Sequence, residues 1–244
     1  NSDYRFPLKV RDLILAALPG NTFLHGGTPE LRHTYLPTSH AKALHLDNML
    51  VVGIRGAGKS FWWSALQNKE HRSVIGKKQA KIGINDSTIT STGFGEMPAP
   101  DDYPGRDVMA VVAQKFDARR IWQAVILRRI GGKTPFAEFN AQEKWGDRVG
   151  WVQAHPEEVA RFFFDEDKRL EQKGVHHLVL FDALDRTADD WQTMHALVRG
   201  LLQALLDFRS YRRIRLKAFV RPDQIKDPAA VSFPDSSKVL TQAV

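Results

Sequence analysis

The sequence predicts an α/β fold, a three-layer sandwich in which helices cover both faces of a mainly parallel central sheet. Short apolar, β-branched segments alternate with segments of helical periodicity along most of the 244 residues. The segment 175–181 is apolar apart from two histidines, which is typical of a strand buried on both faces. Such sheets bind ligands beyond the carboxyl ends of their strands, so polar residues that directly follow a strand are the first site candidates.

Helices are predicted where apolar residues recur every three or four positions between starting and stopping residues. The first ends at Pro19-Gly20, and Thr38 can cap the second. A later one opens with Pro156 and two glutamates, which the helix dipole favours, and stops at Gly174. The predicted helices cover residues 7–18, 38–46, 60–67, 118–130, 136–145, 156–172 and 188–208.

Strands are predicted at 49–52, near 80–84, at 175–181 and at 214–220. The stretch from 85 to 107 is rich in Gly, Pro, Ser, Thr and Asp and is predicted to be a loop, either a lid or partner-binding element or a disordered insertion. We therefore expect an N-terminal helical segment over 1–47 and one core over 48–244. That core contains the loop near 85–107 and a helical insertion near 117–173.

Composition excludes several classes of protein. The chain is 43% hydrophobic and 26% charged, as in ordinary globular domains. It has no apolar run of the roughly 18 residues that a membrane span needs, no secretory signal and no cysteine, so we expect no membrane contact, no disulfide and a cytoplasmic location. A net charge of +7 favours an anionic ligand, either a nucleoside triphosphate or a nucleic acid. Because the chain starts at Asn1 without a methionine, we expect a piece of a longer protein, truncated at its C-terminus.

Residues 53–60 read GIRGAGKS and satisfy G-x-x-x-x-G-K-[ST] between a predicted strand and a predicted helix. Glycines let such a loop bend around an anion with its N–H groups inward. We expect the Lys59 ammonium at the β- and γ-phosphates and the Ser60 hydroxyl among the ligands of Mg²⁺. The residues expected to bind nucleotide are Gly53, Arg55, Gly56, Ala57, Gly58, Lys59, Ser60 and Phe61.

Aromatic rings follow this loop at positions 61–63, and core packing is favoured over base stacking for most of them. Farther along the chain, Asp182 directly follows the predicted strand 175–181, where we expect a carboxylate that organises Mg²⁺ through water. Asp185 and Arg186 come three and four residues later, close enough to face a γ-phosphate.

The segment Gly53–Ser60 resembles a Walker A motif, and Leu178–Arg186 (LVLFDALDR) is similar to the Walker B region of the KAP and STAND branches of P-loop ATPases. The resemblance covers about residues 48–66 and 176–223. It implies a P-loop NTPase core that binds ATP with Mg²⁺ and hydrolyses it. ATP is expected over GTP from this resemblance, because no N-K-x-D tetrapeptide is present.

Those families usually carry an acidic residue directly after the Walker B aspartate, and this chain has Ala183 there. Either Asp185 orients the attacking water, or hydrolysis is slow and the domain is a nucleotide-dependent switch. We favour a catalytic Asp185 over a structural one paired with Arg186.

In the STAND branch the next strand often ends in an arginine that senses the γ-phosphate, and Arg221 follows the strand 214–220. A salt bridge with Asp223 or Asp227 is the alternative. We expect a five-strand-type core with this strand between the two motif strands.

The sequence therefore predicts an ATPase, the motor or switch part of a larger protein or complex, with Lys59, Asp185 and Arg221 as catalytic residues. The alternatives are a signalling or assembly switch with little turnover and a nucleic-acid-associated ATPase of a bacterial defence system. A protein partner or an oligomer is expected. We interpret the basic cluster of Arg209, Arg212 and Arg213 as a solvated helix end, in preference to a nucleic-acid surface. We expect a structural role for His176 and His177, in preference to a metal site.

Overall fold

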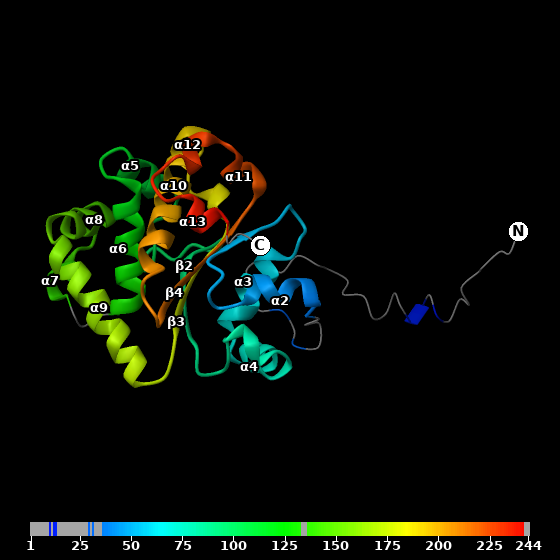
Figure 1. The fold of residues 1–244 in the computed structure, drawn as a ribbon. Helices are drawn as coiled ribbons and strands as arrows, with labels where there is room; N and C mark the ends of the chain where they lie inside the picture. Colours follow the sequence, from blue (N-terminus) through cyan, green and yellow to red (C-terminus); the bar gives the residue numbers. More distant parts are fainter. Residues whose placement is uncertain are drawn as a thin grey trace, which may run out of the picture.

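The computed structural model describes residues 36–132 and 136–241, together with positions 10, 12, 13, 29 and 31. Its four strands form one parallel sheet in the order β1-β4-β3-β2 (Figure 1). They are β1 (Leu50–Val52), β2 (Ile89–Phe94), β3 (His177–Phe181) and β4 (Ile214–Val220). The predicted α/β fold with a parallel sheet is confirmed, and β4 lies between β1 and β3 as expected. Four strands are found among the described residues where a five-strand core was expected.

Helices cover both faces of the sheet (Figure 1). Neighbouring residues of β3 point to opposite faces, so Leu178 and Leu180 belong to one apolar core and Val179 and Phe181 to the other. The first core lies under α2 (Thr38–Leu44), α3 (Lys59–Gln67), α4 (Lys69–Lys78) and the 3₁₀ turn η2 (Ala80–Ile82). The helices on the second core are α5 (Arg106–Ala113), α6 (Ala118–Gly131), α7 (Ala137–Ala141), α8 (Trp145–Ala154), α9 (Pro156–Gln172), α10 (Trp191–Phe208), α12 (Pro228–Val231) and α13 (Ser237–Leu240).

The prediction of a strand near residues 80–84 is wrong. Residues Ala80–Ile82 form a 3₁₀ turn, and the strand is β2, inside the stretch predicted to be a loop. β2 is an edge strand whose first four residues are exposed or half-buried, so its sequence ITSTGF lacks the apolar run that predicts a strand. Gly93 is required there, because a Cβ would lie 2.3 Å from the Phe181 ring of β3.

Several helix boundaries also differ from the predicted ones. The segment 136–145 contains α7 and the start of α8, because Gln142 returns to extended backbone. α10 begins at Trp191 because the Asp190 side chain accepts a backbone N–H of the first turn at 2.8 Å. Helices α4 and α5 were not predicted. Most of the helix predicted over 7–18 lies outside the described residues.

A buried lysine joins the sheet to the segment that precedes β1. Lys217 of β4 has no solvent exposure, and its ammonium donates to the carbonyl oxygens of Ala43 and His45, each at 2.9 Å, and of Asn48. Burial lowers the pKa of Lys217 to about 7. The end of α2 is therefore fixed to the centre of the sheet. None of the helices in the described part of the chain has the length and apolar character of a membrane span.

Candidate nucleotide site

The glycine-rich loop 53–60 runs from the end of β1 into α3, as predicted. Gly56 (φ 81°) and Gly58 (φ 83°) adopt the left-handed backbone conformation that glycine tolerates best. The Gly53 N–H donates to the Val220 carbonyl at 3.1 Å, which ties the loop to the end of β4. The amino end of α3 therefore faces the carboxyl end of the sheet, where free N–H groups and the helix dipole favour an anion.

Lys59 is the first residue of α3, and its side chain lies back across the loop. Its ammonium donates to the Gly53 carbonyl at 2.7 Å and to the Ile54 carbonyl at 2.9 Å. Burial lowers the pKa of Lys59 below its ordinary value, and the negative charge of Asp182 opposes this shift. A positive charge is thus held at the mouth of the loop.

Asp182 directly follows β3 and is 6% exposed. Its N–H donates to the Phe94 carbonyl of β2 at 3.0 Å, and its carboxylate accepts a hydrogen bond from the Ser60 hydroxyl. Burial raises the pKa of Asp182, while this hydrogen bond, the Ala183 N–H and the charge of Lys59 oppose the rise. Two oxygen groups from the two motifs therefore lie in direct contact.

The Ser60 and Asp182 oxygens suit Mg²⁺ better than they suit a metal ion whose ligands all come from the protein. The described residues contain no group of three His, Cys, Asp or Glu side chains that could hold a metal. Mg²⁺ commonly takes one or two protein oxygens and completes its shell with water and substrate phosphates. The Ser60 hydroxyl and the Asp182 carboxylate are suited to that arrangement.

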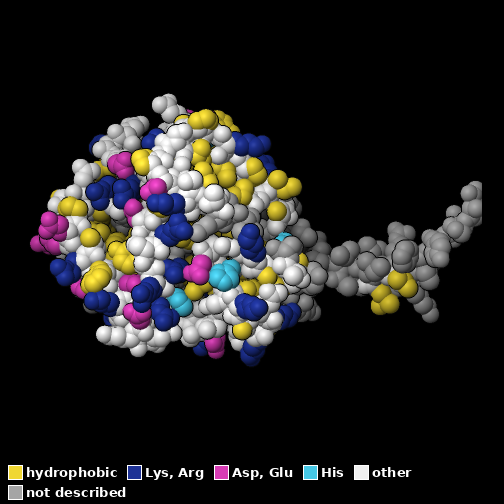
Figure 2. Space-filling model, viewed as in Figure 1, with side chains coloured by type: hydrophobic (Ala, Val, Ile, Leu, Met, Phe, Trp, Pro, Cys, Tyr) yellow, Lys and Arg dark blue, Asp and Glu magenta, His cyan; other side chains and the backbone are white. Residues whose placement is uncertain are grey.

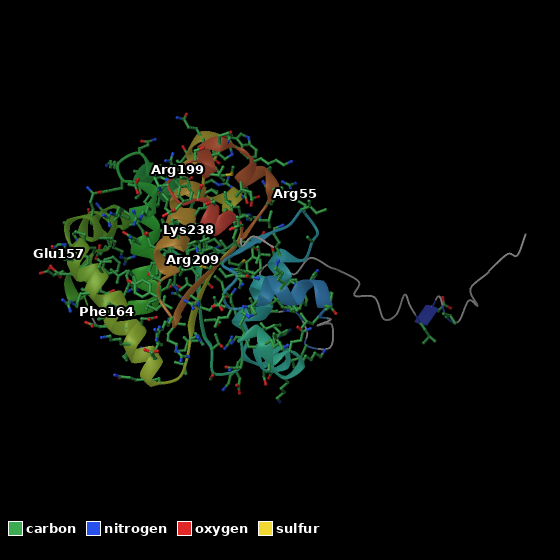
Figure 3. All side chains as sticks on the ribbon, in the orientation of Figure 1. Arg55, Glu157, Phe164, Arg199, Arg209 and Lys238 are labelled. Atoms are coloured by element: carbon green, nitrogen blue, oxygen red, sulfur yellow. The ribbon has the colours of Figure 1, made fainter. Side chains whose placement is uncertain are left out.

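One cleft of about 600 Å³ brings the predicted residues together. It is lined by every predicted site residue except Gly53 and Ala57, which line a smaller neighbouring cavity. Arg55 extends from the tip of the loop beside α11 (Pro222–Lys226) (Figure 3). Three regions that lie far apart in the sequence, around residues 56, 182 and 221, thus line the same cleft.

Arg221 forms a salt bridge with Asp223, the alternative to a γ-phosphate contact that the sequence left open. Its guanidinium donates to both carboxylate oxygens of Asp223, with Nη2 to Oδ2 at 2.9 Å, and Nη1 donates to Asp185 Oδ2 at 2.9 Å. These contacts raise the pKa of Arg221, mainly through Asp223, and Arg221 in turn lowers the pKa of Asp223. Asp185 therefore pairs with Arg221, which follows the neighbouring strand, and Arg186 pairs with Glu96 instead.

Sequence reasoning missed Glu96, which lines the same cleft two residues beyond β2. Its Oε1 accepts from Arg186 Nη2 at 2.5 Å. The prediction of a loop over 85–107 concealed it, since no strand end was expected there. The backbone conformation of Ala183 was also not predicted: it is left-handed (φ 56°), between Asp182 and the 3₁₀ turn η3 (Leu184–Arg186).

The aromatic residues after the loop divide between core and cleft. Trp62 and Trp63 are 5% and 7% exposed and belong to the core under α3, which confirms their predicted packing. Trp62 also donates to His40 Nδ1 at 2.9 Å. Phe61 lines the cleft and meets the Trp62 ring edge-on, with centroids 5.1 Å apart.

The basic cluster lies away from the cleft. Arg209 follows α10 (Figure 3), and Arg212 and Arg213 precede β4, at the opposite end of this strand from Arg221. Arg212 lies 3.4 Å from Glu171. On the face shown in Figure 2, Asp and Glu side chains lie among the more numerous Lys and Arg side chains. A solvated helix end remains the favoured interpretation.

No protein-family model matches the chain, and neither does any curated protein or any solved structure. The interpretation of the cleft therefore depends on the residues that line it.

Proposed function

We propose that the chain is a Mg²⁺-dependent, ATP-binding and ATP-hydrolysing P-loop domain of the KAP/STAND type, the motor or switch part of a larger protein or complex. One observation carries the proposal. The loop at the amino end of α3, the Lys59 ammonium and the paired oxygens of Ser60 and Asp182 all face one cleft at the carboxyl end of a parallel sheet. A polyphosphate with a divalent ion matches this combination of charges.

The groups that would bind the phosphates of ATP already line the cleft. The loop N–H groups take phosphate oxygens, and Lys59 exchanges its contacts with the Gly53 and Ile54 carbonyls for the β- and γ-phosphates. Ser60 and Asp182 would hold Mg²⁺, which would supply positive charge against the charge that develops on the phosphates. Arg221 lies across the cleft, where its planar guanidinium can bind a γ-phosphate.

Hydrolysis needs little covalent chemistry from the protein. The oxygen of a water molecule forms a bond to the γ-phosphorus, the bond between this phosphorus and the β–γ bridging oxygen breaks, and ADP, inorganic phosphate and a proton are released. The chain contributes positioning and positive charge. Asp185 has two competing roles, because the predicted water-orienting carboxylate also holds Arg221.

A switch with little turnover is the second candidate, and the ion pairs of Arg221 favour it. A γ-phosphate that attracts this guanidinium must compete with Asp185 and Asp223. Binding of ATP would then release the turn after β3 and α11, the two elements that carry these carboxylates, whereas ADP would leave them joined. Phosphate release under multiple turnover separates the two candidates.

The proposal is tested by calorimetric titration of ATP into the purified chain and into Lys59→Ala. The variant loses a charge-assisted contact with the phosphates, so its ATP affinity is expected to fall at least about tenfold. The same titration in EDTA is expected to weaken wild-type binding, because the Ser60 and Asp182 oxygens lose the ion that links them to phosphate.

Lys69→Ala is the matched control, since Lys69 is an exposed lysine at the start of α4, outside the cleft. It removes the same charge and is expected to leave the ATP affinity unchanged. Circular dichroism confirms that both variants are folded. Equal affinities of the wild type and the folded Lys59→Ala variant would defeat the proposal.

A further inference from the structure

Three acidic residues line the cleft among the residues that the structure describes: Glu96, Asp182 and Asp185. The carboxylates of Asp182 and Asp185 already accept hydrogen bonds from other side chains. The Asp182 carboxylate accepts the Ser60 hydroxyl, in the place that suits the metal, and Asp185 Oδ2 accepts Arg221 Nη1 at 2.9 Å. The residue after Asp182 is Ala183, whose side chain has no polar group that can orient a water.

Glu96 is placed differently. β2 and β3 pair in parallel with Phe94 opposite Phe181, so Glu96 and Asp182 extend from neighbouring strand ends into the same cleft. The Glu96 side chain is 38% exposed, and its partner Arg186 is 50% exposed on the turn after β3. A solvent-exposed ion pair of this kind orients a carboxylate at small energetic cost and releases it easily.

On this basis, and given the ATPase function proposed above, we infer that Glu96 is the residue that orients and deprotonates the attacking water, while Asp185 holds Arg221. In this step a Glu96 carboxylate oxygen takes the proton from water as the water oxygen bonds to the γ-phosphorus and the bond to the β–γ bridging oxygen breaks. The proton then passes to the released phosphate or to solvent. Arg186 acts as a positioning residue through its contact with Glu96 Oε1.

The test compares Glu96→Gln with Asp185→Asn in the full chain. Glutamine retains an oxygen that can accept from Arg186 but cannot take a proton. Single-turnover hydrolysis of ATP by Glu96→Gln is expected to slow by about 100- to 10,000-fold, the usual contribution of a general base. Its calorimetric ATP affinity is expected to stay within about threefold of wild type, because no phosphate contact is lost. Asp185→Asn is expected to lose less than about tenfold in the same rate.

Glu143→Gln, an exposed glutamate between α7 and α8, is the matched control and should hydrolyse ATP at the wild-type rate. An unchanged rate in Glu96→Gln, or a larger loss in Asp185→Asn than in Glu96→Gln, would overturn the inference and leave the ATPase proposal intact. Failure of the wild-type chain to bind ATP would remove the proposed function itself. Binding without any hydrolysis would overturn both the proposed hydrolysis and the role of Glu96, and would favour the switch.

Discussion

Arg221 Nη1 donates to Asp185 Oδ2 at 2.9 Å, and this contact joins the residue that follows β4 to the 3₁₀ turn that follows β3. Asp223 holds the other side of the same guanidinium. Arg221 is 13% exposed at its side chain, so both ion pairs are partly shielded from water. A ligand that withdraws this arginine therefore changes the contacts of two separate elements at once.

If the chain binds ATP as proposed, this arrangement predicts that Arg221→Lys binds ATP less selectively over ADP than the wild type does. An ammonium cannot bind Asp185, Asp223 and a γ-phosphate with the geometry of a planar guanidinium. The ATP affinity is expected to fall by about tenfold, with the ADP affinity nearly unchanged, as measured by paired calorimetric titrations. Arg209→Lys, at an exposed arginine outside the cleft, should alter neither affinity. An unchanged ATP-to-ADP ratio in Arg221→Lys would contradict γ-phosphate sensing by this residue.

The buried Lys217 predicts a specific dependence of stability on pH. Its pKa is about 7 in the folded chain and near 10.5 in the unfolded chain, so between these values the unfolded state binds more protons. The contribution of this residue to the free energy of unfolding therefore rises as the pH increases from about 7 toward 10, by at most about 1.4 kcal/mol per pH unit. Urea denaturation of the wild type and of Lys217→Met at pH 7, 8 and 9 measures this increase as a growing difference between them.

Lys69→Met provides the control for this measurement, because Lys69 is exposed. Its difference in unfolding free energy from the wild type should stay constant over the same pH range. A constant difference for Lys217→Met as well would show that the folded chain keeps this ammonium charged throughout, supported by the carbonyl oxygens of Ala43, His45 and Asn48.

Two helical glycines predict stability changes of opposite sign. A Cβ at Gly200 of α10 would lie 2.5 Å from the backbone carbon of Ala118 at the start of α6, and backbone cannot move aside easily. Gly200→Ala is therefore expected to lower the free energy of unfolding by about 1–3 kcal/mol. At Gly150 of α8 the atom nearest to an added Cβ is a Phe116 ring carbon at 3.7 Å. Gly150→Ala should therefore raise the free energy of unfolding by about 0.5–1 kcal/mol. Chemical denaturation of both variants checks the pair, and a stabilised Gly200→Ala would show that α6 and α10 are not in close contact.

The parts of the site that follow apolar strands were predictable from sequence. The loop 53–60, Asp182 and Arg221 each come directly after β1, β3 or β4, and parallel strands bring their carboxyl ends to one edge. The partners of Arg221 were not predictable in full. Spacing alone allowed Asp223 or Asp227, and the contact with Asp185 depends on β3 and β4 lying side by side.

Two of the missed elements, β2 and α4, have polar sequences. β2 is a half-exposed edge strand of Thr, Ser and Gly, and α4 (KEHRSVIGKK) is largely charged, so neither shows the apolar periodicity of a strand or a helix. One local signal for α4 was present in Asn68, whose side chain accepts the N–H of Glu70 at 2.8 Å as a helix cap. No comparable signal marks β2, because its pairing with β3 depends on residues far along the chain.

The strand order has a consequence for how the chain folds during synthesis. Among the described strands β1 pairs with β4 alone, Leu50 with Ala218 and Val52 with Val220. A nascent chain therefore carries β1 and its loop without their neighbouring strand until the ribosome has passed residue 220. Such long-range parallel pairing slows folding. The proposed phosphate site should thus be completed late, when β4 inserts between two strands made before it.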